Sequence, residues 1–360
     1  MIQGIRLIHE LSARRVAYLL SFGERLSTRL LTAFLQKTGL PTTQFAATFI
    51  KTTGINYEED EVNWETTKLL VNETLRSHLQ KNTICVVTGF FGTNPNGYIS
   101  LLGRGGSDFT GAILAVSLDI NTVEIWTDVD GFLSADPRVV EDAQIIDEIG
   151  FQEASELCFF GAKVLHPKTI RPVIDNGGQV WIKNTFNASQ RGTKIIQHAQ
   201  EDHREVISIS SKKVGLLSLD LFATQGRKKA ILAQLFKWAS DNEIDIDMIA
   251  ASEAEISFCI EDKYLENAEI KEALSEICPF YIKENRSVVC IVSPKEVKGQ
   301  IGVAGKIFNA IAECGVSVDM YSQNASEIAQ LIVIQSSEVK KVIQNIHEKL
   351  VAREILAETA

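Results

Sequence analysis

The sequence lacks membrane-length apolar runs, surplus positive charge and closely spaced cysteines, and each absence excludes a class of protein. No apolar run in the 360-residue chain approaches the roughly 20 residues that a membrane-spanning helix needs. Lysine and arginine number 36 against 46 aspartates and glutamates, so the formal net charge is −10. A balance this acidic argues against a broad surface for nucleic acid or anionic membranes. We therefore expect neither a membrane nor a nucleic acid among the partners.

The cysteines are scattered along the chain. No two of the six have the short spacing of a zinc or redox site, and they stand at Cys85, Cys158, Cys259, Cys278, Cys290 and Cys314. Most have apolar neighbours, which is typical of buried free thiols in a reducing cytosol. The sequence therefore predicts a cytoplasmic protein without a disulfide framework, and we expect no residues dedicated to a metal.

Helical and strand patterns alternate over residues 1–198. Residues 15–37 and 64–79 have apolar side chains at helical spacing. The short apolar runs that predict strands are Phe45–Ile50, Ile84–Thr88, Val123–Thr127 and Gln179–Lys183. Strands that alternate with helices predict an α/β fold with a mostly parallel sheet.

The rest of the chain contains an internal duplication. The pairs that align are Ala230–Phe236 with Gly302–Phe308, Asp247–Met248 with Asp319–Met320, and Glu255–Ile256 with Glu327–Ile328. Each copy has a helical stretch followed by two strand-like runs. We expect two small βαββ units, at residues 205–282 and 285–356.

A glycine-rich loop precedes a helical run in the first part of the chain. Its sequence is Leu-Leu-Gly-Arg-Gly-Gly-Ser-Asp over residues 101–108, and glycines at 103, 105 and 106 let backbone N–H groups approach an anion. Arg104 adds a planar fork that suits a carboxylate or phosphate. Asp108 makes sense there if it orients a cationic group. The alternative is a glycine turn with a helix cap.

Two further segments carry side chains that suit a nucleotide. Thr127 and Asp128 follow the strand at 123–127, at the carboxyl end where open α/β sheets bind ligands. Arg138 follows the turn signal Asp136-Pro137 and could contact a phosphate. Lys163 follows a Gly-Ala pair that permits close backbone approach, and its ammonium could do the same. Taken singly, each of these residues could instead be an ordinary solvated surface residue.

In combination and in this order, these segments resemble the catalytic domain of lysine-type aspartate kinases, in the amino-acid kinase superfamily. Residues 21–28 are similar to that family's Gly-Glu segment, and the two βαββ units resemble its paired ACT domains. The resemblance runs from about residue 15 to about residue 345. It implies an amino-acid kinase-like three-layer α/β sandwich followed by two ACT domains.

The resemblance also implies a reaction, in which ATP with Mg²⁺ phosphorylates L-aspartate to 4-phospho-L-aspartate. This step opens the routes to lysine and diaminopimelate, threonine and methionine. Arg104 is expected to hold a carboxylate of aspartate, and Glu24 to lie near its amino group. The loop residues between aspartate and the γ-phosphate are Gly105, Gly106, Ser107 and Asp108, with Arg104, Ser107 and Asp108 as the catalytic set. The residues implied on the ATP side are Thr127, Asp128, Arg138 and Lys163.

One family motif is absent. The family begins with a strand and Lys-Phe-Gly-Gly-Thr-Ser, whose lysine serves the transferring phosphoryl group, and this motif occurs nowhere in the chain. We therefore expect that the kinase domain lacks its front and that the 360-residue chain alone phosphorylates aspartate poorly or not at all. The alternatives are a kinase of another acidic amino acid, against which the paired ACT units argue, and a non-catalytic regulatory subunit.

The ACT units imply regulation and assembly. The effector residues implied by resemblance to lysine-inhibited relatives are Ile246, Asp247, Ser252 and Glu253, with L-lysine as the inhibitor. Asp247 or Glu253 could pair with an ammonium group. The basic loop Thr224–Lys229 disfavours the lysine side chain, so threonine or no effector stays open. We also expect a homodimer through residues 205–350.

Overall fold

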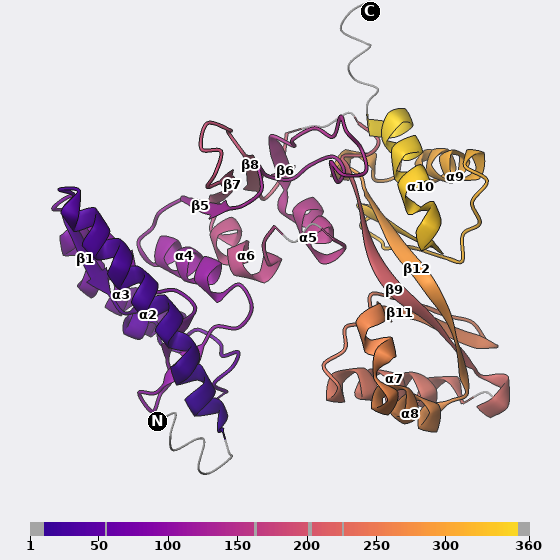
Figure 1. Ribbon diagram of the computed structural model, residues 1–360, viewed down its shortest axis with the longest axis horizontal. Coiled ribbons are helices and arrows are strands. Elements are labelled where there is room, and N and C mark those ends of the chain that lie inside the picture. Colours follow the sequence, from indigo (N-terminus) through magenta and orange to yellow (C-terminus); the bar gives the residue numbers. More distant parts are fainter. Residues whose placement is uncertain (1–10, 55, 162–163, 201–203, 225–226, 352–360) are drawn as a thin grey trace, which may run out of the picture. The chain divides into compact units, whose positions relative to one another are not determined.

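The structure is a computed structural model that describes residues 11–54, 56–161, 164–200, 204–224 and 227–351 (Figure 1). Contacts divide the chain into two units: unit 1 comprises residues 1–130, 147–151 and 164–198, and unit 2 comprises residues 131–146, 152–163 and 199–360. None of the described helices is both long enough and apolar enough to cross a membrane. The expected mixed α/β fold is confirmed.

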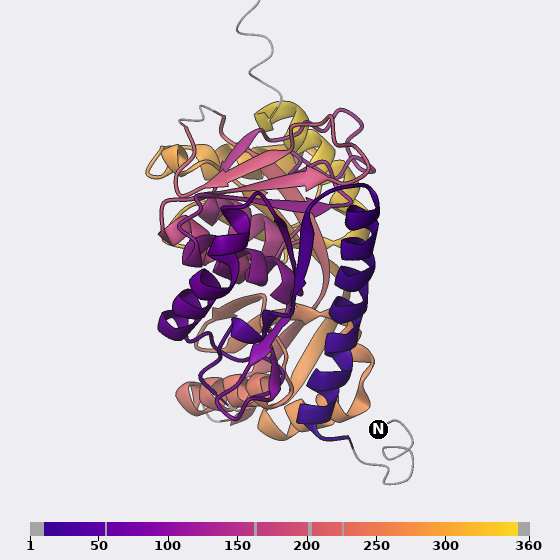
Figure 2. The same ribbon diagram turned by 90° about the vertical axis from the view of Figure 1, so that its left-hand side faces the viewer.

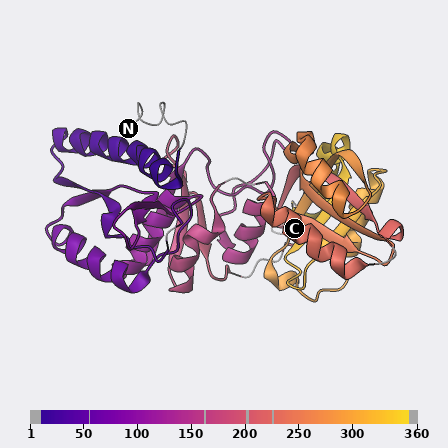
Figure 3. The same ribbon diagram turned by 90° about the horizontal axis from the view of Figure 1, so that it is seen from below.

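Unit 1 contains most of the α/β part. Its elements are α2 (Ala13–Lys37), β1 (Thr42–Phe45), α3 (Trp64–Leu79), β2 (Ile84–Val87), β3 (Phe91–Thr93), β4 (Ile99–Leu101), α4 (Gly106–Ser117), β5 (Thr122–Thr127), β6 (Glu148–Gly150), α6 (Pro167–Asp175), β7 (Gln179–Asn184) and β8 (Thr193–Ile196). The predicted helices at 15–37 and 64–79 are both present. Figures 2 and 3 show α2 and α3 on opposite sides of β1 and β2.

The strands of unit 1 form three sheets in the described residues. Strands β1 and β2 pair in parallel, β3 and β4 form a hairpin, and a four-stranded sheet has the order β5-β7-β8-β6. The predicted strand at 45–50 is wrong in its position, since β1 ends at Phe45 and a short 3-10 turn occupies Ala47–Phe49. The backbone turns there because the N–H of Ala47 donates to Thr88 Oγ1, 2.8 Å away.

Helix α2 buries a row of small polar residues. Ser21 and Thr28 face inward, and the Thr28 hydroxyl donates to the carbonyl of Glu24 at 2.7 Å. The large apolar residues Leu26 and Leu30 lie on the outside, 60% and 74% exposed. Because residues three and four apart share a helix face, Glu24 lies in the inward row between Ser21 and Thr28.

Unit 2 contains the duplicated part of the chain and almost all of α5 (Phe151–Phe159), whose first residue belongs to unit 1. Its other elements are β9 (Ser208–Asp220), α7 (Lys228–Asp241), β10 (Met248–Ala251), β11 (Glu255–Glu261), α8 (Ala268–Ile277), β12 (Phe280–Val292), α9 (Val303–Glu313), β13 (Met320–Gln323), β14 (Ala329–Gln335) and α10 (Val339–Ile346). Both copies follow the predicted β-α-β-β order, and each adds a further helix.

The two copies share one antiparallel sheet of order β10-β11-β9-β12-β14-β13. The long strands β9 and β12 pair along their whole length, so the first residues of β9 join the core of the second copy while its last residues join the core of the first. Figure 1 shows α7 and α8 at one end of these strands and α9 and α10 at the other. The boundary between 282 and 285 falls inside β12, and the domain ranges stay predictions.

The structure corrects one part of the sequence alignment between the copies. Met248 pairs with Cys259 across β10 and β11, whereas Met320 pairs with Val333 across β13 and β14. The second copy therefore has a longer turn, with five residues between its strands where the first has three. As a result Gln330, rather than Ile328, is the structural counterpart of Ile256.

Candidate functional site

The glycine-rich loop ends at the amino terminus of α4. Gly103 and Gly105 have φ values of 77° and 69°, and Gly105 is the N-cap, without a side-chain cap hydrogen bond. A Cβ at Gly105 would lie 2.9 Å from Thr169 Cγ2 and 3.3 Å from His166 Cβ. The left-handed backbone and the tight packing both demand glycine. The N–H of Gly106 donates to the carbonyl of Gly103 at 3.2 Å. The loop therefore presents the N–H groups of Ser107 and Asp108, in the first turn of α4, to an anion.

A second backbone segment closes on this loop, and the sequence did not single it out. A Cβ at Gly89 would lie 2.8 Å from Ser107 Oγ, and one at Gly106 would lie 3.1 Å from Phe90 Cα. Phe90 itself has φ of 72°, which is strained for an aromatic residue. The Gly89-Phe90-Phe91-Gly92 sequence was the available signal, but its backbone conformation is a tertiary effect.

The structure joins Glu24 to the glycine loop. Ser107 Oγ donates to Glu24 Oε1 at 2.9 Å, across 83 residues of sequence. Helix α2 positions the carboxylate from its inward row, and α4 positions the hydroxyl in its first turn. Two segments that the family resemblance placed at one substrate are therefore in contact.

Two charged residues of the loop are left without partners. Arg104 is exposed and makes no ion pair or hydrogen bond with any described side chain. Asp108 is partly buried, and burial raises the pKa of its carboxyl group. Asp108 likewise has no cation beside it among the residues described. The loop thus has a cation suited to a carboxylate and a carboxylate suited to a cation.

The residues predicted for the ATP side fall into both units. Thr127 ends β5, and its hydroxyl donates to the Asp128 carboxylate at 3.1 Å. Arg138 lies in unit 2, where its guanidinium pairs with Asp136 at 2.6 Å. Lys163 lies outside the described residues. In this structure Arg138 is held by its neighbour, so a phosphate would have to compete with Asp136 for it.

The segment around Arg138 is fastened to the end of the ACT part of unit 2. Ser134 is fully buried, and its hydroxyl lies 2.8 Å from His347 Nε2. Burial lowers the pKa of His347, which favours the neutral ring in this contact. The Gln344 amide also donates to the carbonyl of Val139 at 2.8 Å. The segment 131–146 is therefore a fixed part of unit 2.

The predicted effector residues lie in different environments. Ile246 packs partly buried against the first core, and the Ser252 hydroxyl accepts from the N–H groups of Ala254 and Glu255. Asp247 has a side chain with no exposure and pairs with Lys212 at 2.9 Å. Glu253 is 96% exposed, 3.6 Å from Lys228. Glu253 is thus the carboxylate that solvent reaches.

Two sequence families match the chain. The Amino acid kinase family matches residues 2–184, and an ACT domain family matches residues 289–350. The first match covers half of the chain and contains the glycine loop and the Glu24 segment. The second coincides with the second copy of the duplicated part.

The curated relatives of the chain include aspartokinases of plants and fungi. Aspartokinase 2, chloroplastic, of Arabidopsis thaliana is 32% identical over 96% of this chain and 66% of its own length. The aspartokinase of Schizosaccharomyces pombe is 30% identical over 97% of this chain and 72% of its own. The chain thus spans just under two thirds of the first relative.

The solved structures agree with this match. E. coli aspartokinase III with lysine and aspartate superposes with a TM-score of 0.83 at 26% identity, covering 94% of this chain and 76% of that one. The same enzyme with aspartate and ADP gives a TM-score of 0.76 at 27% identity over the same shares.

Proposed function

Because the chain belongs to the aspartokinase family, we propose that it binds L-aspartate and ATP and transfers the γ-phosphoryl group to the aspartate side chain. The products are 4-phospho-L-aspartate and ADP. The observation that carries this proposal is the hydrogen bond of 2.9 Å between Glu24 and Ser107, on the same loop as Arg104, which has no partner among the described residues. A carboxylate, a hydroxyl, a guanidinium and free helix N–H groups at one loop match the charges of aspartate and a phosphate.

The chemistry asks little of acid–base groups. The aspartate carboxylate is ionised near pH 7 and needs no base to become a nucleophile. Arg104 holds a substrate carboxylate, and Glu24 faces the substrate ammonium. The N–H groups of Ser107 and Asp108 stabilise charge on the phosphoryl oxygens. Ser107 is oriented by Glu24 and fixes the loop. Catalysis is then positioning and charge neutralisation.

Mg²⁺ enters this proposal with the nucleotide. Within the described residues no group of three or more His, Cys, Asp or Glu side chains could hold an ion. Mg²⁺ usually keeps several waters and binds through substrate phosphates plus one or two carboxylates. Asp108, partly buried and unpaired, fits as such a carboxylate. Bound there, the ion would neutralise phosphate charge.

We also propose how the protein is regulated, how it assembles and where it is located. The ACT part of unit 2 would take L-lysine near Glu253 and join a second copy into a homodimer, which buries more apolar surface than two small units can alone. We place the enzyme in the cytoplasm, since its cysteines are free thiols.

The reaction is tested in protein purified from its natural source, so that any accompanying polypeptide is present. Hydroxylamine traps the acyl phosphate as a hydroxamate, and a coupled assay follows ADP. We expect both products to depend on L-aspartate and not on L-glutamate. Hydroxamate formation with glutamate alone would favour a kinase of another acidic amino acid. If neither hydroxamate nor ADP were formed, a regulatory subunit would be favoured.

Asp108→Asn should make the protein more stable at pH 7 and less active. Burial raises the pKa of Asp108 above its unfolded value, so the ionised form is disfavoured in the fold. The contribution of Asp108 to stability is present below the unfolded pKa and is lost as pH rises through the folded pKa. The amide cannot ionise and removes this loss. We expect a higher Tm at pH 7 and a kcat lower by roughly a hundredfold. A lower Tm would contradict the burial argument.

Glu253→Ala should abolish binding of L-lysine. The Glu253 carboxylate is almost fully exposed and near Lys228, whereas the Asp247 carboxylate is buried and neutralised by Lys212. The ammonium group of a lysine ligand is therefore expected to pair with Glu253. Calorimetric titration of the whole chain with lysine and with threonine measures this, and Glu266→Ala is a matched control in the same unit. Threonine binding without a lysine signal would contradict the lysine assignment.

A further inference from the structure

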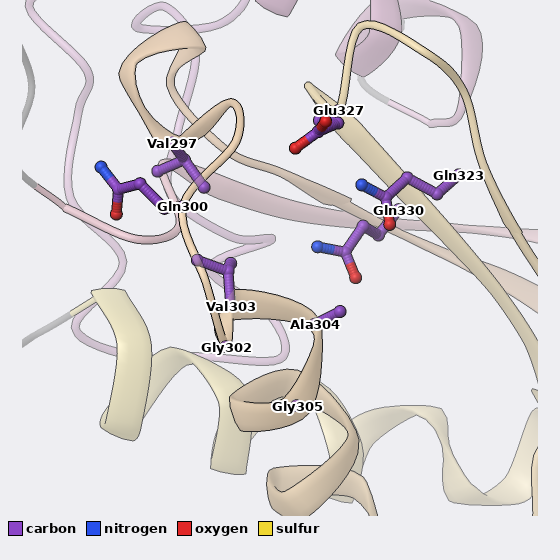
Figure 4. Close-up of a pocket in the computed structure, with 9 residues that line it drawn as sticks. All are labelled: Val297, Gln300, Gly302, Val303, Ala304, Gly305, Gln323, Glu327 and Gln330. Atoms are coloured by element: carbon purple, nitrogen blue, oxygen red, sulfur yellow. The ribbon is translucent and has the colours of Figure 1, made fainter.

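Three helices of unit 1 line a cavity of about 260 Å³. The residues that line it are Trp64 and Lys68 on α3, Val116 and Ser117 on α4, and Pro172 and Asn176 at the end of α6. The cavity of about 110 Å³ beside the first turn of α9, shown in Figure 4, has less than half this volume. Ligand pockets begin at about 300 Å³, so the cavity in unit 1 is close to the size that holds a small organic molecule.

This cavity lies at the opposite end of α4 from the glycine loop. Gly106 begins α4 and Ser117 ends it, and a rise of about 1.5 Å per residue puts roughly 16 Å between them. Helix α6 likewise begins near the loop, because Thr169 lies against Gly105, and Pro172 comes in its last turn. The cavity is therefore separate from the proposed aspartate site.

Ser117 contributes a buried hydroxyl without a partner to the wall of this cavity. The residue is fully buried, and its Oγ makes no hydrogen bond with any described residue. Thr110, on the same helix, donates to the carbonyl of Gly106 four residues back at 2.8 Å, which is the usual solution for a helical hydroxyl. Ser117 does not do the same with Ile113. A buried hydroxyl without a partner destabilises the fold, and a ligand that bonds to Oγ would remove this cost.

Two rings line the cavity, those of Trp64 and Pro172. The indole of Trp64 packs edge-on against Phe109 at a ring-centroid distance of 6.2 Å, yet Trp64 stays 38% exposed. On each helix a polar side chain follows four residues later and shares the same face, Lys68 after Trp64 and Asn176 after Pro172. The Asn176 amide nitrogen donates to the carbonyl of Pro172 at 2.8 Å. The cavity thus offers ring surface next to groups that bind a polar substituent.

Lys68 brings positive charge that its neighbours do not fully balance. Its Nζ lies 2.9 Å from Asp119 Oδ1, and Arg76 approaches the other oxygen of Asp119 at 3.6 Å. Two cations of the described chain therefore share one carboxylate. Glu65, which follows Trp64 on α3, does not line the cavity. The surplus positive charge suits an anionic group on a ligand.

We propose that this cavity binds a small aromatic carboxylic acid that carries a polar substituent on its ring. The ring lies on Trp64, the carboxylate on Lys68, and the polar substituent on the hydroxyl of Ser117. A ring without a carboxylate leaves the charge of Lys68 unused, and a carboxylate without a ring leaves the apolar wall in water. This binding is separate from the phosphoryl transfer and does not rest on it.

Calorimetric titration of the whole chain with 2-, 3- and 4-hydroxybenzoate tests this proposal. We expect at least one isomer to bind, and phenol, acetate and unsubstituted benzoate to bind roughly tenfold more weakly. Ser117→Ala should weaken binding of that isomer about tenfold without lowering the Tm, and should leave binding of benzoate unchanged. Ser77→Ala, which removes an exposed hydroxyl on α3, should leave binding of the isomer unchanged.

Lys68→Met is the second variant, and its exposed position leaves the core intact if Ser117→Ala does not fold. It should weaken binding of the hydroxybenzoate about fivefold, whereas Lys81→Met, just beyond the end of α3, should not. Arg104→Ala should leave this binding unchanged, which separates the cavity from the glycine loop. The proposal is overturned if no isomer binds, or if binding is unchanged in Lys68→Met or in a folded Ser117→Ala.

Discussion

In a protein that also carries the family's Lys-Phe-Gly-Gly-Thr-Ser segment, Arg104→Ala is expected to raise the L-aspartate concentration for half-maximal ADP release about a hundredfold, with a much smaller change for ATP. Arg104 extends from the glycine loop and has no partner among the described residues, so its fork is available to a substrate carboxylate. Two charge-assisted hydrogen bonds are worth roughly 3 kcal/mol together, which corresponds to about a hundredfold in affinity. Steady-state kinetics with each substrate varied in turn measures the change.

Two variants sharpen this result. Arg104→Lys keeps the charge without the fork and should recover only part of the affinity. Arg171→Ala, which removes an exposed arginine paired with Asp175 on α6, should leave both substrate requirements unchanged. Lys163→Ala should show the reverse pattern, raising the ATP requirement more than the aspartate requirement. If Arg104→Ala affected only ATP, the assignment of the glycine loop would be wrong.

Lys212→Met is expected to destabilise the protein by about 3–5 kcal/mol, because it strands a buried charge. Lys212 Nζ lies 2.9 Å from Asp247 and 3.1 Å from Glu261, and the Asp247 side chain has no exposure. The second oxygen of Asp247 already lacks a hydrogen-bond partner. Burial raises the pKa of Asp247, and Lys212 opposes that rise. Urea unfolding at pH 7 measures the loss.

The stability loss in Lys212→Met should depend on pH, in a direction that the pKa of Asp247 determines. Without Lys212 the folded pKa of Asp247 rises further above its unfolded value. Stability from the protonated carboxyl is then present below the unfolded pKa and is lost as pH rises through the folded pKa. The deficit of Lys212→Met should therefore shrink toward acid pH. A deficit that grew on acidification would contradict the assignment.

Matched variants isolate the pair. Lys212→Met combined with Asp247→Leu should recover most of the lost stability, since no uncompensated charge remains buried. Lys213→Met removes the neighbouring exposed lysine and should change stability by less than about 0.5 kcal/mol. A similar loss of stability in Lys212→Met and in Lys213→Met would show that the effect comes from strand β9 in general and not from the ion pair.

The sequence predicted the elements that local pattern determines. The helices at 15–37 and 64–79 follow from the spacing of apolar residues, and the structure adds that Asn63 caps α3 as a side-chain acceptor. The glycine loop was also readable, because positive φ at Gly103 and Gly105 and close packing restrict those positions to glycine. These features depend on residues near one another in sequence.

Features that depend on residues far apart in sequence could not be predicted from local patterns. The sharing of β9 and β12 by both copies depends on strand pairing across 61 residues, for Leu219 with Phe280, to 84 residues, for Ser208 with Val292. No local signal sets this pairing. The strained Phe90 and the exposed apolar side of α2 are likewise products of tertiary packing. The two-residue shift between β11 and β14 came from turn length, which the matching Glu-Ile pairs concealed.

Calorimetric titration of the 360-residue chain with L-aspartate tests directly whether Arg104, Glu24 and the glycine loop form an aspartate site. We expect saturable binding of L-aspartate, weaker binding of L-glutamate, and loss of binding in both Arg104→Ala and Glu24→Ala. Absence of aspartate binding, or equal binding by wild type and Arg104→Ala, would contradict this assignment.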